Sequence, residues 1–383
     1  MNKVIFPGQT IGIIGGGQLG RMLALSAKEM GFRIAVLDPT PNSPCAQVAD
    51  IEIVASYNDQ QAIEKLASVS DVITYEFENI DYDCLQWIEE HSYLPQGSQL
   101  LHVTQNRFTE KSAIVEAGIP VAAFRLCQTE DDLIHGVEDF SYPCVLKTTT
   151  GGYDGKGQIV LKSEEDLAEA KQLIEQRECI LEDWVPFDKE VSVIVVRGIG
   201  GETSVFPVAE NIHVENILHA SIVPARISDE LRAQAVRCAE TLANELGLIG
   251  ILAVEMFVTK DEHIFVNELA PRPHNSGHYT MDACATSQFG QHVRAICGWP
   301  LGEITLLKPV VMFNILGEHI EAVYQKIDQY SNAKLHMYGK AEAKKKRKMG
   351  HLNILAQSTK EALEKASALR IWEREEQWLE GKR

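Results

Sequence analysis

Two segments decide how the centre of this chain folds, Ile251-Leu-Ala-Val-Glu-Met-Phe-Val258 and His263-Ile-Phe-Val-Asn-Glu-Leu269. Both are rich in apolar residues typical of strands, and Lys260-Asp-Glu-His263 between them predicts the turn of a hairpin. In that hairpin Glu255 lies opposite Glu268 on one face of the sheet. Opposed carboxylates repel each other unless a cation lies between them, and Mg2+ is commonly held by one or two carboxylates plus phosphate oxygens. The pattern therefore predicts a Mg2+ site beside a nucleotide.

The same register sets Phe257 opposite Val266. A different interpretation is a solvent-facing hairpin whose acids are scattered and serve no site. The apolar character of both strands, and the sequence Arg272-Pro-His-Asn275 that follows directly, favour the buried site.

Length, composition and charge narrow the class of protein. The chain has 383 residues, enough for two or three domains, and 45% hydrophobic and 23% charged residues, as in globular proteins. No apolar run has the length of a membrane span, and the first residues lack the apolar region of a signal peptide, so we expect a cytoplasmic protein. The net charge of −18 argues against binding to nucleic acids or to anionic membranes. Eight cysteines without close spacing indicate reduced, mostly buried thiols.

The first hundred residues predict an open parallel α/β sheet. Strands are expected at 10–14, 33–38 and 72–76, with a helix at 18–30. A boundary follows near 106–120 and another near Trp299-Pro300; beyond it we expect strands at 310–316 and 351–355, a basic stretch at 340–348 and a charged helix from 359 to the end.

A glycine motif, Gly15-Gly-Gly-Gln-Leu-Gly20, follows the first strand and opens the first helix, and Asp38 ends the next strand. One interpretation is a dinucleotide site, in which the glycines approach a phosphate at the helix N-terminus and Asp38 binds a ribose. The other keeps the anion site but gives it a monophosphate or the edge of a substrate. The motif alone does not distinguish the two.

A second glycine loop carries more information. Lys147 lies on a predicted strand, and Gly151-Gly-Tyr-Asp-Gly-Lys-Gly157 then joins it to the next strand. Such a loop can lie over phosphates and donate backbone N–H groups, while Lys147 supplies an ammonium group; a flexible hairpin tip is the plain alternative. Further on, the strand that ends at Glu182-Asp-Trp-Val185 can expose backbone groups to an adenine, and Glu190, at the start of the next strand, can accept from ribose hydroxyls.

The order of these features over about residues 106–300 resembles the ATP-grasp fold. Six motifs resemble, more narrowly, the N5-carboxyaminoimidazole ribonucleotide synthetases, ATP-grasp ligases of purine synthesis: Gly15 to Arg21, Tyr75-Glu-Phe-Glu-Asn79, Gly151 to Gly157, Glu210-Asn-Ile-His213, Asn267 to His278, and Arg347-Lys-Met-Gly-His351. The resemblance covers essentially the whole chain. It implies an N-terminal open parallel α/β domain (1–105), an ATP-grasp domain (106–300, with a lid at about 120–190) and a small β-rich C-terminal domain (301–383).

The resemblance also implies a reaction. ATP phosphorylates bicarbonate, and the carboxylate of the resulting carboxyphosphate passes to the 5-amino group of aminoimidazole ribonucleotide. No protein nucleophile with a paired base stands out in the sequence, in agreement with an acyl phosphate that is not bound to the enzyme. The implied cofactors are ATP and Mg2+, the partners are small-molecule substrates, and the assembly is a homodimer.

The resemblance assigns roles residue by residue. Residues implied to bind ATP are Arg107, Lys147, Gly152, Tyr153, Asp154, Gly155, Lys156, Gly157, Gln158, Glu182, Asp183, Trp184, Val185, Glu190, His213, Asn267 and Glu268. Arg272, Lys147, His274 and Asn275 are implied in catalysis, with bicarbonate and carboxyphosphate on Arg272, His274 and Asn275. The ribonucleotide is implied to contact Gln18, Leu19, Glu76, Asn79, Tyr153, Asp154, Lys340, Arg347 and Lys348. His213 has a plain alternative as a core histidine.

Two departures from the family pattern limit what is carried over. Relatives usually have Arg-Pro-Gly where this chain has Lys344-Lys-Lys346, so no phosphate contact is assigned there; a solvated charge patch or a localisation signal is the other interpretation of the basic stretch. Many ATP-grasp enzymes place an Asn metal ligand where this chain has Ala270, which leaves two carboxylates for the metal.

Three other functions fit parts of the sequence. A formate-dependent glycinamide ribonucleotide formyltransferase shares the acyl-phosphate chemistry. An NAD-dependent dehydrogenase would use the first glycine motif, but it leaves Lys147 and the Glu255/Glu268 pair unexplained. A catalytically silent ATP-binding regulator would not need Arg272 and both glutamates.

Overall fold

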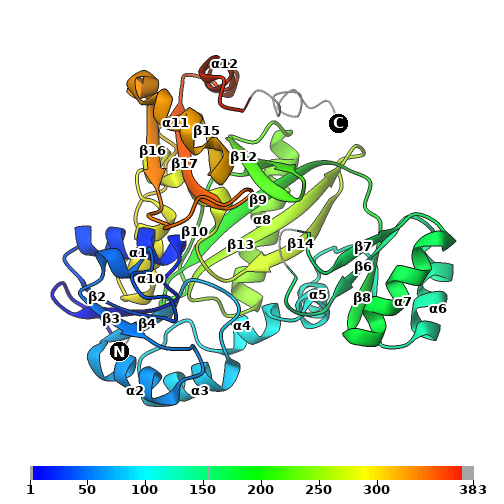
Figure 1. The fold of residues 1–383 in the computed structure, drawn as a ribbon, viewed down its shortest axis with the longest axis horizontal. Coiled ribbons are helices and arrows are strands. Elements are labelled where there is room, and N and C mark those ends of the chain that lie inside the picture. Colours follow the sequence, from blue (N-terminus) through cyan, green and yellow to red (C-terminus); the bar gives the residue numbers. More distant parts are fainter. Residues whose placement is uncertain (1–2, 153–154, 373–383) are drawn as a thin grey trace.

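The computed structural model describes residues 3–152 and 155–372. Three sheets form three parts of the molecule (Figure 1), and residues of each part line one central hollow. The predicted parallel α/β sheet is present at the N-terminus, and it is followed by a small antiparallel sheet and a large antiparallel sheet that extends into the C-terminal residues.

The N-terminal part is a four-stranded parallel sheet with the order β3-β2-β1-β4. Its elements are β1 (Thr10–Ile14), α1 (Gln18–Glu29), β2 (Arg33–Asp38), η1 (Ala46–Val48), β3 (Ile51–Val54), α2 (Gln60–Val69), β4 (Val72–Tyr75) and α3 (Tyr82–His91). Alternate strand residues face two cores, one shared with α1 and one with α2 and α3. Because β1 and β4 are parallel neighbours, the glycine motif after β1 and the segment after β4 meet at one edge of the sheet.

The small sheet has the order β5-β8-β6-β7 and lies apart from the rest, at the right of Figure 1. It consists of β5 (Phe124–Cys127), α6 (Glu130–Phe140), β6 (Cys144–Thr148), β7 (Gln158–Leu161), η2 (Glu164–Asp166), α7 (Leu167–Gln176) and β8 (Cys179–Asp183). Helices α6 and α7 cover one face, and their apolar residues share a core with the strands. Its other face turns toward the hollow and carries Lys147 and Glu182. Two helices, α4 (Gln99–Thr104) and α5 (Arg107–Glu116), lead into this part.

The large sheet has nine strands, in the order β14-β13-β9-β11-β12-β15-β17-β16, with β10 beside β9. Its first half comprises β9 (Phe187–Arg197), β10 (Thr203–Val205), β11 (Ala209–Val214), β12 (Ile217–Val223), α8 (Asp229–Glu245), β13 (Gly250–Thr259) and β14 (Ile264–Ala270), followed by η3 (Asn275–Gly277), α9 (Thr280–Ala283) and α10 (Gln288–Ile296). Helix α8 packs on one face, and α10 lies between the other face and α1 of the N-terminal part.

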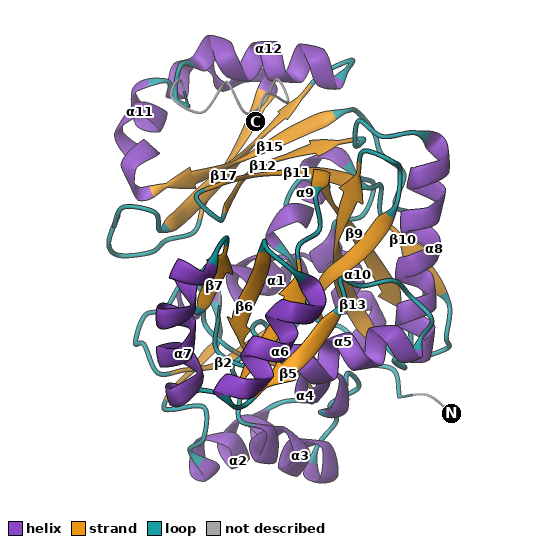
Figure 2. Cartoon of the chain, turned by 90° about the vertical axis from the view of Figure 1, so that its right-hand side faces the viewer, coloured by secondary structure: helices purple, strands orange, loops and turns teal. Residues whose placement is uncertain are grey.

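The C-terminal strands continue the large sheet, because β15 pairs with β12. The elements are β15 (Val310–Leu316), η4 (Gly317–His319), α11 (Ile320–Gln325), η5 (Ile327–Asn332), β16 (Ala333–Met337), β17 (Lys348–Leu355) and α12 (Thr359–Leu369). Figure 2 shows α12 above these strands and α11 to one side, and apolar residues of both helices share a core with β15 and β17. Strand β17 begins at Lys348, three residues before the predicted strand, so that Lys348 is held by the sheet.

The hairpin of β13 and β14 confirms the predicted pairing of the two glutamates and corrects one detail of the register. Glu255 lies opposite Glu268, as expected. Val266, however, lies opposite Met256 and not Phe257, because a bulge places Asn267 as an extra residue in β14. A bulge changes the direction of neighbouring side chains and often occurs beside active sites. Here it lets Asn267 and Glu268, although adjacent in sequence, both line the hollow.

All eight cysteines are buried and none forms a disulfide. Among the described residues, none of the helices combines the length and apolar character needed to cross a bilayer.

Candidate active site

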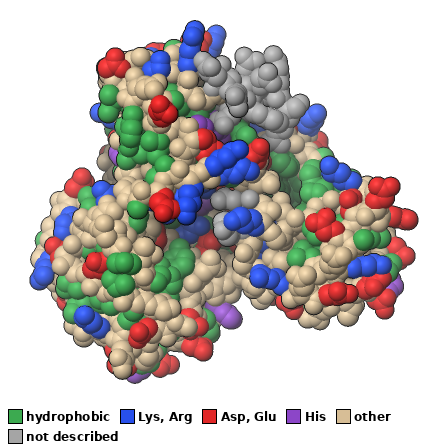
Figure 3. All heavy atoms as spheres, in the orientation of Figure 1, with side chains coloured by type: hydrophobic (Ala, Val, Ile, Leu, Met, Phe, Trp, Pro, Cys, Tyr) green, Lys and Arg blue, Asp and Glu red, His purple; other side chains and the backbone are tan. Residues whose placement is uncertain are grey.

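The three parts enclose a cavity of about 490 Å³, a size typical of small-molecule sites. Figure 3 shows the hollow between the lobes, with Lys and Arg side chains gathered around it. The small sheet lines one side of the cavity, β13 and β14 line the other, and Lys348 of β17 reaches it from the C-terminal strands. Within the part of the chain that the structure describes, five Lys and Arg side chains line the cavity beside seven Asp and Glu side chains, so the cations that could bind an anionic ligand lie next to carboxylates.

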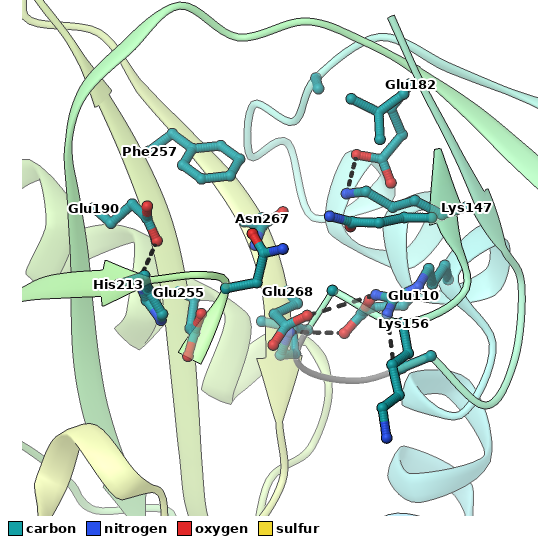
Figure 4. Close-up of a pocket in the computed structure, with 18 of the residues that line it drawn as sticks. Glu110, Lys147, Lys156, Glu182, Glu190, His213, Glu255, Phe257, Asn267 and Glu268 are labelled. Atoms are coloured by element: carbon teal, nitrogen blue, oxygen red, sulfur yellow. Dashed lines mark hydrogen bonds and ion pairs between the residues drawn. The ribbon is translucent and has the colours of Figure 1, made fainter. Parts of the chain in front are cut away.

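The opposed carboxylates Glu255 and Glu268 lie on the wall made by β13 and β14 (Figure 4). Burial, together with repulsion from Glu268, raises the pKa of Glu255 to about 8. Glu110 of α5 lies behind them, where burial and repulsion from Glu268 also raise its pKa to about 8. Its Oε1 accepts a hydrogen bond of 2.7 Å from the N–H of Leu269. Burial and mutual repulsion therefore oppose full ionisation of the carboxylates on this wall, and a bound cation would reduce that repulsion.

Two residues of the small sheet and Lys111 of α5 make an ion-pair cluster on the facing side. The Nζ of Lys147 lies 2.9 Å from Oε2 of Glu182, and the Nζ of Lys111 lies 3.3 Å from the same oxygen. Burial opposes ionisation of Glu182, but the two ammonium groups outweigh it and hold its pKa below the ordinary value. Burial, with the nearby Lys111 and Arg107, also lowers the pKa of Lys147, although Glu182 opposes that shift. The other carboxylate oxygen of Glu182 is buried without a hydrogen-bond partner among the described residues.

The floor of the cavity combines apolar rings with a polar pair. Phe187 and Phe257 stack with their centroids 4.5 Å apart, and both line the cavity. Next to them the Nδ1 of His213 lies 2.6 Å from Oε2 of Glu190, an ion pair seen in Figure 4. Burial alone would lower the pKa of His213, but the negative charges of Glu190 and Glu255 raise it by more than burial lowers it. The pKa is therefore above the ordinary value. Glu190 lies inside β9, not at its start, so the sheet holds this pair rigidly.

The segment after β14 forms a polar corner. The guanidinium of Arg272 contacts the carboxylate of Glu78, and its Nε is buried without a partner among the described residues. Burial and the positive charge of Arg272 hold the pKa of His274 well below its ordinary value. Neutral His274 accepts at Nδ1 from the backbone N–H of Ser276 (3.3 Å), so its Nε2 is the donor to Oε1 of Glu255 at 3.1 Å.

Asn275 completes this corner. Its side chain is buried and lines the cavity, and neither its Oδ1 nor its Nδ2 has a hydrogen-bond partner within the described chain. Leaving a buried amide without partners costs about 1–3 kcal/mol. A ligand that offers both a donor and an acceptor would remove that cost.

The glycine N–H groups of the motif after β1 already have hydrogen-bond partners within the chain, contrary to our expectation. The N–H groups of Gly17 and Gly20 donate to the two oxygens of Glu76, at 2.7 and 2.8 Å. The N–H of Gly16 donates to Asp38 at 2.7 Å, and the hydroxyl of Tyr57 donates to the same oxygen at 2.6 Å. The N-terminus of α1 therefore already binds a carboxylate of its own chain. The glycine N–H groups and Asp38, which the dinucleotide interpretation assigns to a phosphate and a ribose, therefore bind other groups of the chain.

Several residues expected to contact the ribonucleotide do meet beside this motif. The Nζ of Lys340 donates to Oε1 of Gln18 at 2.6 Å and to the carbonyl oxygen of Lys348 at 2.7 Å. Burial and the charges of Arg347 and Lys348 lower the pKa of Lys340 to about 8. Asn79 and Lys348 also line the main cavity, whereas Leu19 is buried in the N-terminal core. The structure thus joins segments more than 300 residues apart into one basic patch next to the cavity.

The described residues expected to bind the nucleotide lie together around the cavity. Of the described residues expected to contact ATP, all except Gly157 line the cavity, and all four residues expected in catalysis do so too. Tyr153 and Asp154 lie outside the described residues. The sequence analysis missed Glu78, Glu110 and Lys111. Glu78 stands in a motif that was quoted, whereas Glu110 and Lys111 have no signal in the sequence, since two charged residues in a helix normally face solvent.

Comparisons with known proteins agree with this geometry. Residues 112–289 match the ATP-grasp domain, residues 8–105 the ribonucleotide synthetase pre-ATP-grasp domain, and residues 310–365 the phosphoribosylaminoimidazole carboxylase C-terminal domain. The N5-carboxyaminoimidazole ribonucleotide synthase of Bacillus subtilis is 58% identical over 355 residues, which are 93% of this chain and 93% of the relative.

Two solved structures carry ligands. An ADP complex of an N5-carboxyaminoimidazole ribonucleotide synthetase is 68% identical, with a TM-score of 0.96 over 98% of this chain and 100% of the other. The enzyme of Aspergillus clavatus, in complex with ADP and 5-aminoimidazole ribonucleotide, is 33% identical, with a TM-score of 0.91 over 97% of this chain and 100% of the other. From the identity, the coverage and the three matched domains together, the chain belongs to the N5-carboxyaminoimidazole ribonucleotide synthases, a family of ATP-grasp ligases.

Proposed function

We propose that this chain carboxylates 5-aminoimidazole ribonucleotide to N5-carboxyaminoimidazole ribonucleotide in purine biosynthesis, with ATP and bicarbonate as co-substrates. The observation that carries the proposal is the cavity itself, in which a cationic wall, an opposed carboxylate pair and the corner of Arg272 and Asn275 face one another. The relatives' names and the ligands of their solved structures support it.

ATP would lie with its base between the small sheet and the rings of Phe187 and Phe257 in the large sheet, and with its phosphates toward β14. The stacked rings of Phe187 and Phe257 offer an apolar surface to adenine, and the segment after β8 offers backbone groups to its edge. Glu190, held by His213, would accept from the ribose hydroxyls. Lys147 and Arg107 would neutralise phosphate charge, because both carry cationic groups into the cavity.

Glu255 and Glu268 fit a divalent cation. They oppose each other, and their repulsion contributes to the raised pKa of Glu255, which a cation would reverse. The described residues contain no cluster of three or more His, Cys, Asp or Glu side chains with metal-ligand geometry. Two carboxylates plus phosphate oxygens and water make the ligand set that Mg2+ usually takes beside a nucleotide. When bound, Mg2+ supplies charge neutralisation for phosphoryl transfer.

The chemistry then needs two steps. An oxygen of bicarbonate attacks the γ-phosphorus, the bond to ADP breaks, and carboxyphosphate forms. The 5-amino nitrogen attacks the carboxyl carbon and loses a proton, and the C–O bond breaks to release phosphate with its electron pair. Arg272 and Asn275 would hold the planar anion, since both present unpartnered polar atoms to the corner. His274 would keep Glu255 oriented through its Nε2–H.

The ribonucleotide would lie between the N-terminal part and β17. Its phosphate would bind on the patch of Lys340, Arg347 and Lys348, and Gln18 would contact it through the side chain that Lys340 already orients. Glu76 would act mainly by holding the glycine motif in place. The domain division at about residues 105 and 300, a cytoplasmic location and a homodimer are further parts of this proposal, which rest on the family.

The formate-dependent formyltransferase and the dehydrogenase are not favoured, because the relatives bear another name and the glycine motif is filled by the chain itself. The test is ADP release in four mixtures, with bicarbonate or formate and with or without aminoimidazole ribonucleotide. The proposal requires ADP release that depends on bicarbonate and increases with the ribonucleotide. Release triggered by formate would overturn it.

A further inference from the structure

Lys111 of α5 is a buried cation that the reaction does not account for. Its side chain is 2% exposed, and it is not among the residues that line the cavity. Its Nζ lies 3.3 Å from Oε2 of Glu182 in the small sheet and donates to the carbonyl oxygen of Asn267 in β14 at 3.2 Å. Lys111 therefore links the two walls of the nucleotide cavity from behind without reaching the ligand.

The carbonyl that Lys111 binds belongs to the extra residue of the bulge. A bulge leaves backbone groups without ladder partners, and β14 lies at the edge of its sheet. The neighbouring Glu110 accepts from the N–H of Leu269, two residues further along the same edge. Two adjacent residues of α5 thus form hydrogen bonds with backbone groups of β14 on either side of Glu268.

The charge of Lys111 also sets the net charge of the cluster that it forms with Glu182 and Lys147. Glu182 is shared by Lys111 and Lys147, so the cluster has two positive charges and one negative charge. Only Lys147 and Glu182 of the three line the cavity. Without Lys111, Lys147 and Glu182 would form a neutral pair, and the ammonium of Lys147 would be held by the carboxylate alone.

We propose that Lys111 is a positioning residue for the nucleotide phosphates: it neutralises Glu182, which leaves the charge of Lys147 available to ATP, and it fixes the bulge that orients Asn267 and Glu268. This inference rests on the proposed function, since it assumes that a nucleotide occupies the cavity. A purely structural lysine would serve packing alone, and an unbranched apolar side chain could replace it.

The test compares ligands with and without phosphates. Calorimetry measures the Kd values of ADP with Mg2+ and of adenosine for the parent, Lys111→Met, and Lys111→Met with Glu182→Gln. Loss of one fixed charge should lower the ratio of adenosine Kd to ADP Kd by about tenfold in Lys111→Met. In the double variant Lys147 again supplies one net positive charge, so the ratio should return to within about threefold of the parent.

Arg226→Met is the matched control. Glu210 is also a buried carboxylate shared by two cations, with Arg226 and Lys189 (3.4 Å) in contact with it, and none of the three lines the cavity. This variant should leave the ratio unchanged. Lys111→Arg, which keeps the charge, serves if Lys111→Met does not fold, and should retain a ratio within about threefold of the parent while Lys147→Met lowers it.

The outcomes distinguish failure of the role proposed for Lys111 from failure of the proposed function. An unchanged ratio in Lys111→Met, or equal losses for ADP and adenosine, would overturn the inference and leave the proposed function standing. A double variant that binds ADP no better than the single variant would also overturn it. Failure of the parent to bind ADP would overturn both.

Discussion

Glu268→Gln should separate the catalytic role of the carboxylate pair from its effect on stability. Opposed side chains on neighbouring strands have Cβ atoms about 5 Å apart, and two unit charges at about that distance repel by about 3 kcal/mol at an effective dielectric constant near 20. The side chain of Glu268 is 42% exposed and lies 3.5 Å from Arg107. Solvent screening and the loss of that ion pair reduce the net gain from removing its charge to about 1 kcal/mol.

The sign of this effect depends on pH. Burial and Glu268 raise the pKa of Glu255 from 4.5 to about 8, so the folded protein retains a proton that the unfolded chain loses between these values. The stability that this proton contributes is present below pH 4.5 and is lost as the pH rises through about 8. At pH 6 Glu255 is therefore uncharged and has no repulsion to relieve, whereas at pH 9 it is charged.

We expect Glu268→Gln, free of metal and nucleotide, to melt about 1–2 °C above the parent at pH 9 and at or slightly below it at pH 6. Its ATP-dependent turnover should fall by at least about a hundredfold, because the cation loses one of two carboxylate ligands. Thermal melts at both pH values and an ADP-release assay measure these quantities. A variant that melts well below the parent at pH 9, or that keeps near-parental turnover at ordinary Mg2+, would refute the reasoning.

Three further outcomes follow from the same geometry. Lys147→Ala should raise the KM for ATP and slow the phosphoryl step by about ten- to a hundredfold, and unaltered kinetics over a range of ATP concentrations would contradict the role given to its ammonium. Gly17→Val should weaken binding of aminoimidazole ribonucleotide and spare that of ADP. A Cβ at Gly17 would lie 2.5 Å from Oε1 of Glu76 and displace the carboxylate that holds the motif. Paired calorimetry measures both affinities, with NAD as a ligand that should not bind. EDTA should abolish turnover and Mg2+ should restore it, while activity that persists without a divalent cation would contradict the function assigned to Glu255 and Glu268.

The sequence predicted those parts of the fold and site that depend on local pattern. The apolar strands around Glu255 and Glu268 and the four-residue turn between them were enough to set these carboxylates face to face. The bulge at Asn267 could not be predicted, because Phe265-Val-Asn-Glu-Leu269 has no glycine or proline to mark it. The side chains that hydrogen-bond to the backbone around it, Glu110 and Lys111, lie far away in sequence.

The glycine motif shows what a local pattern leaves undetermined. Its pattern correctly placed a strand, a turn and a helix N-terminus, and the anion site was real. The occupant was the side chain of Glu76, which the sequence analysis had assigned to the ribonucleotide. The parallel pairing of β1 with β4 brings the ends of both strands together, and that neighbour relation depends on the topology of the sheet and not on the motif.

The central claim is that bicarbonate is activated by ATP in this cavity, and the fate of its oxygen tests that claim most directly. With 18O-labelled bicarbonate, ATP and aminoimidazole ribonucleotide, attack on the γ-phosphorus leaves one bicarbonate oxygen in the bridging position of carboxyphosphate, and that oxygen departs with the phosphate. We therefore predict one 18O atom in each inorganic phosphate formed, in equal amount to ADP and carboxylated ribonucleotide. Phosphate without the label, or ADP formed at the same rate in the absence of bicarbonate, would contradict the account.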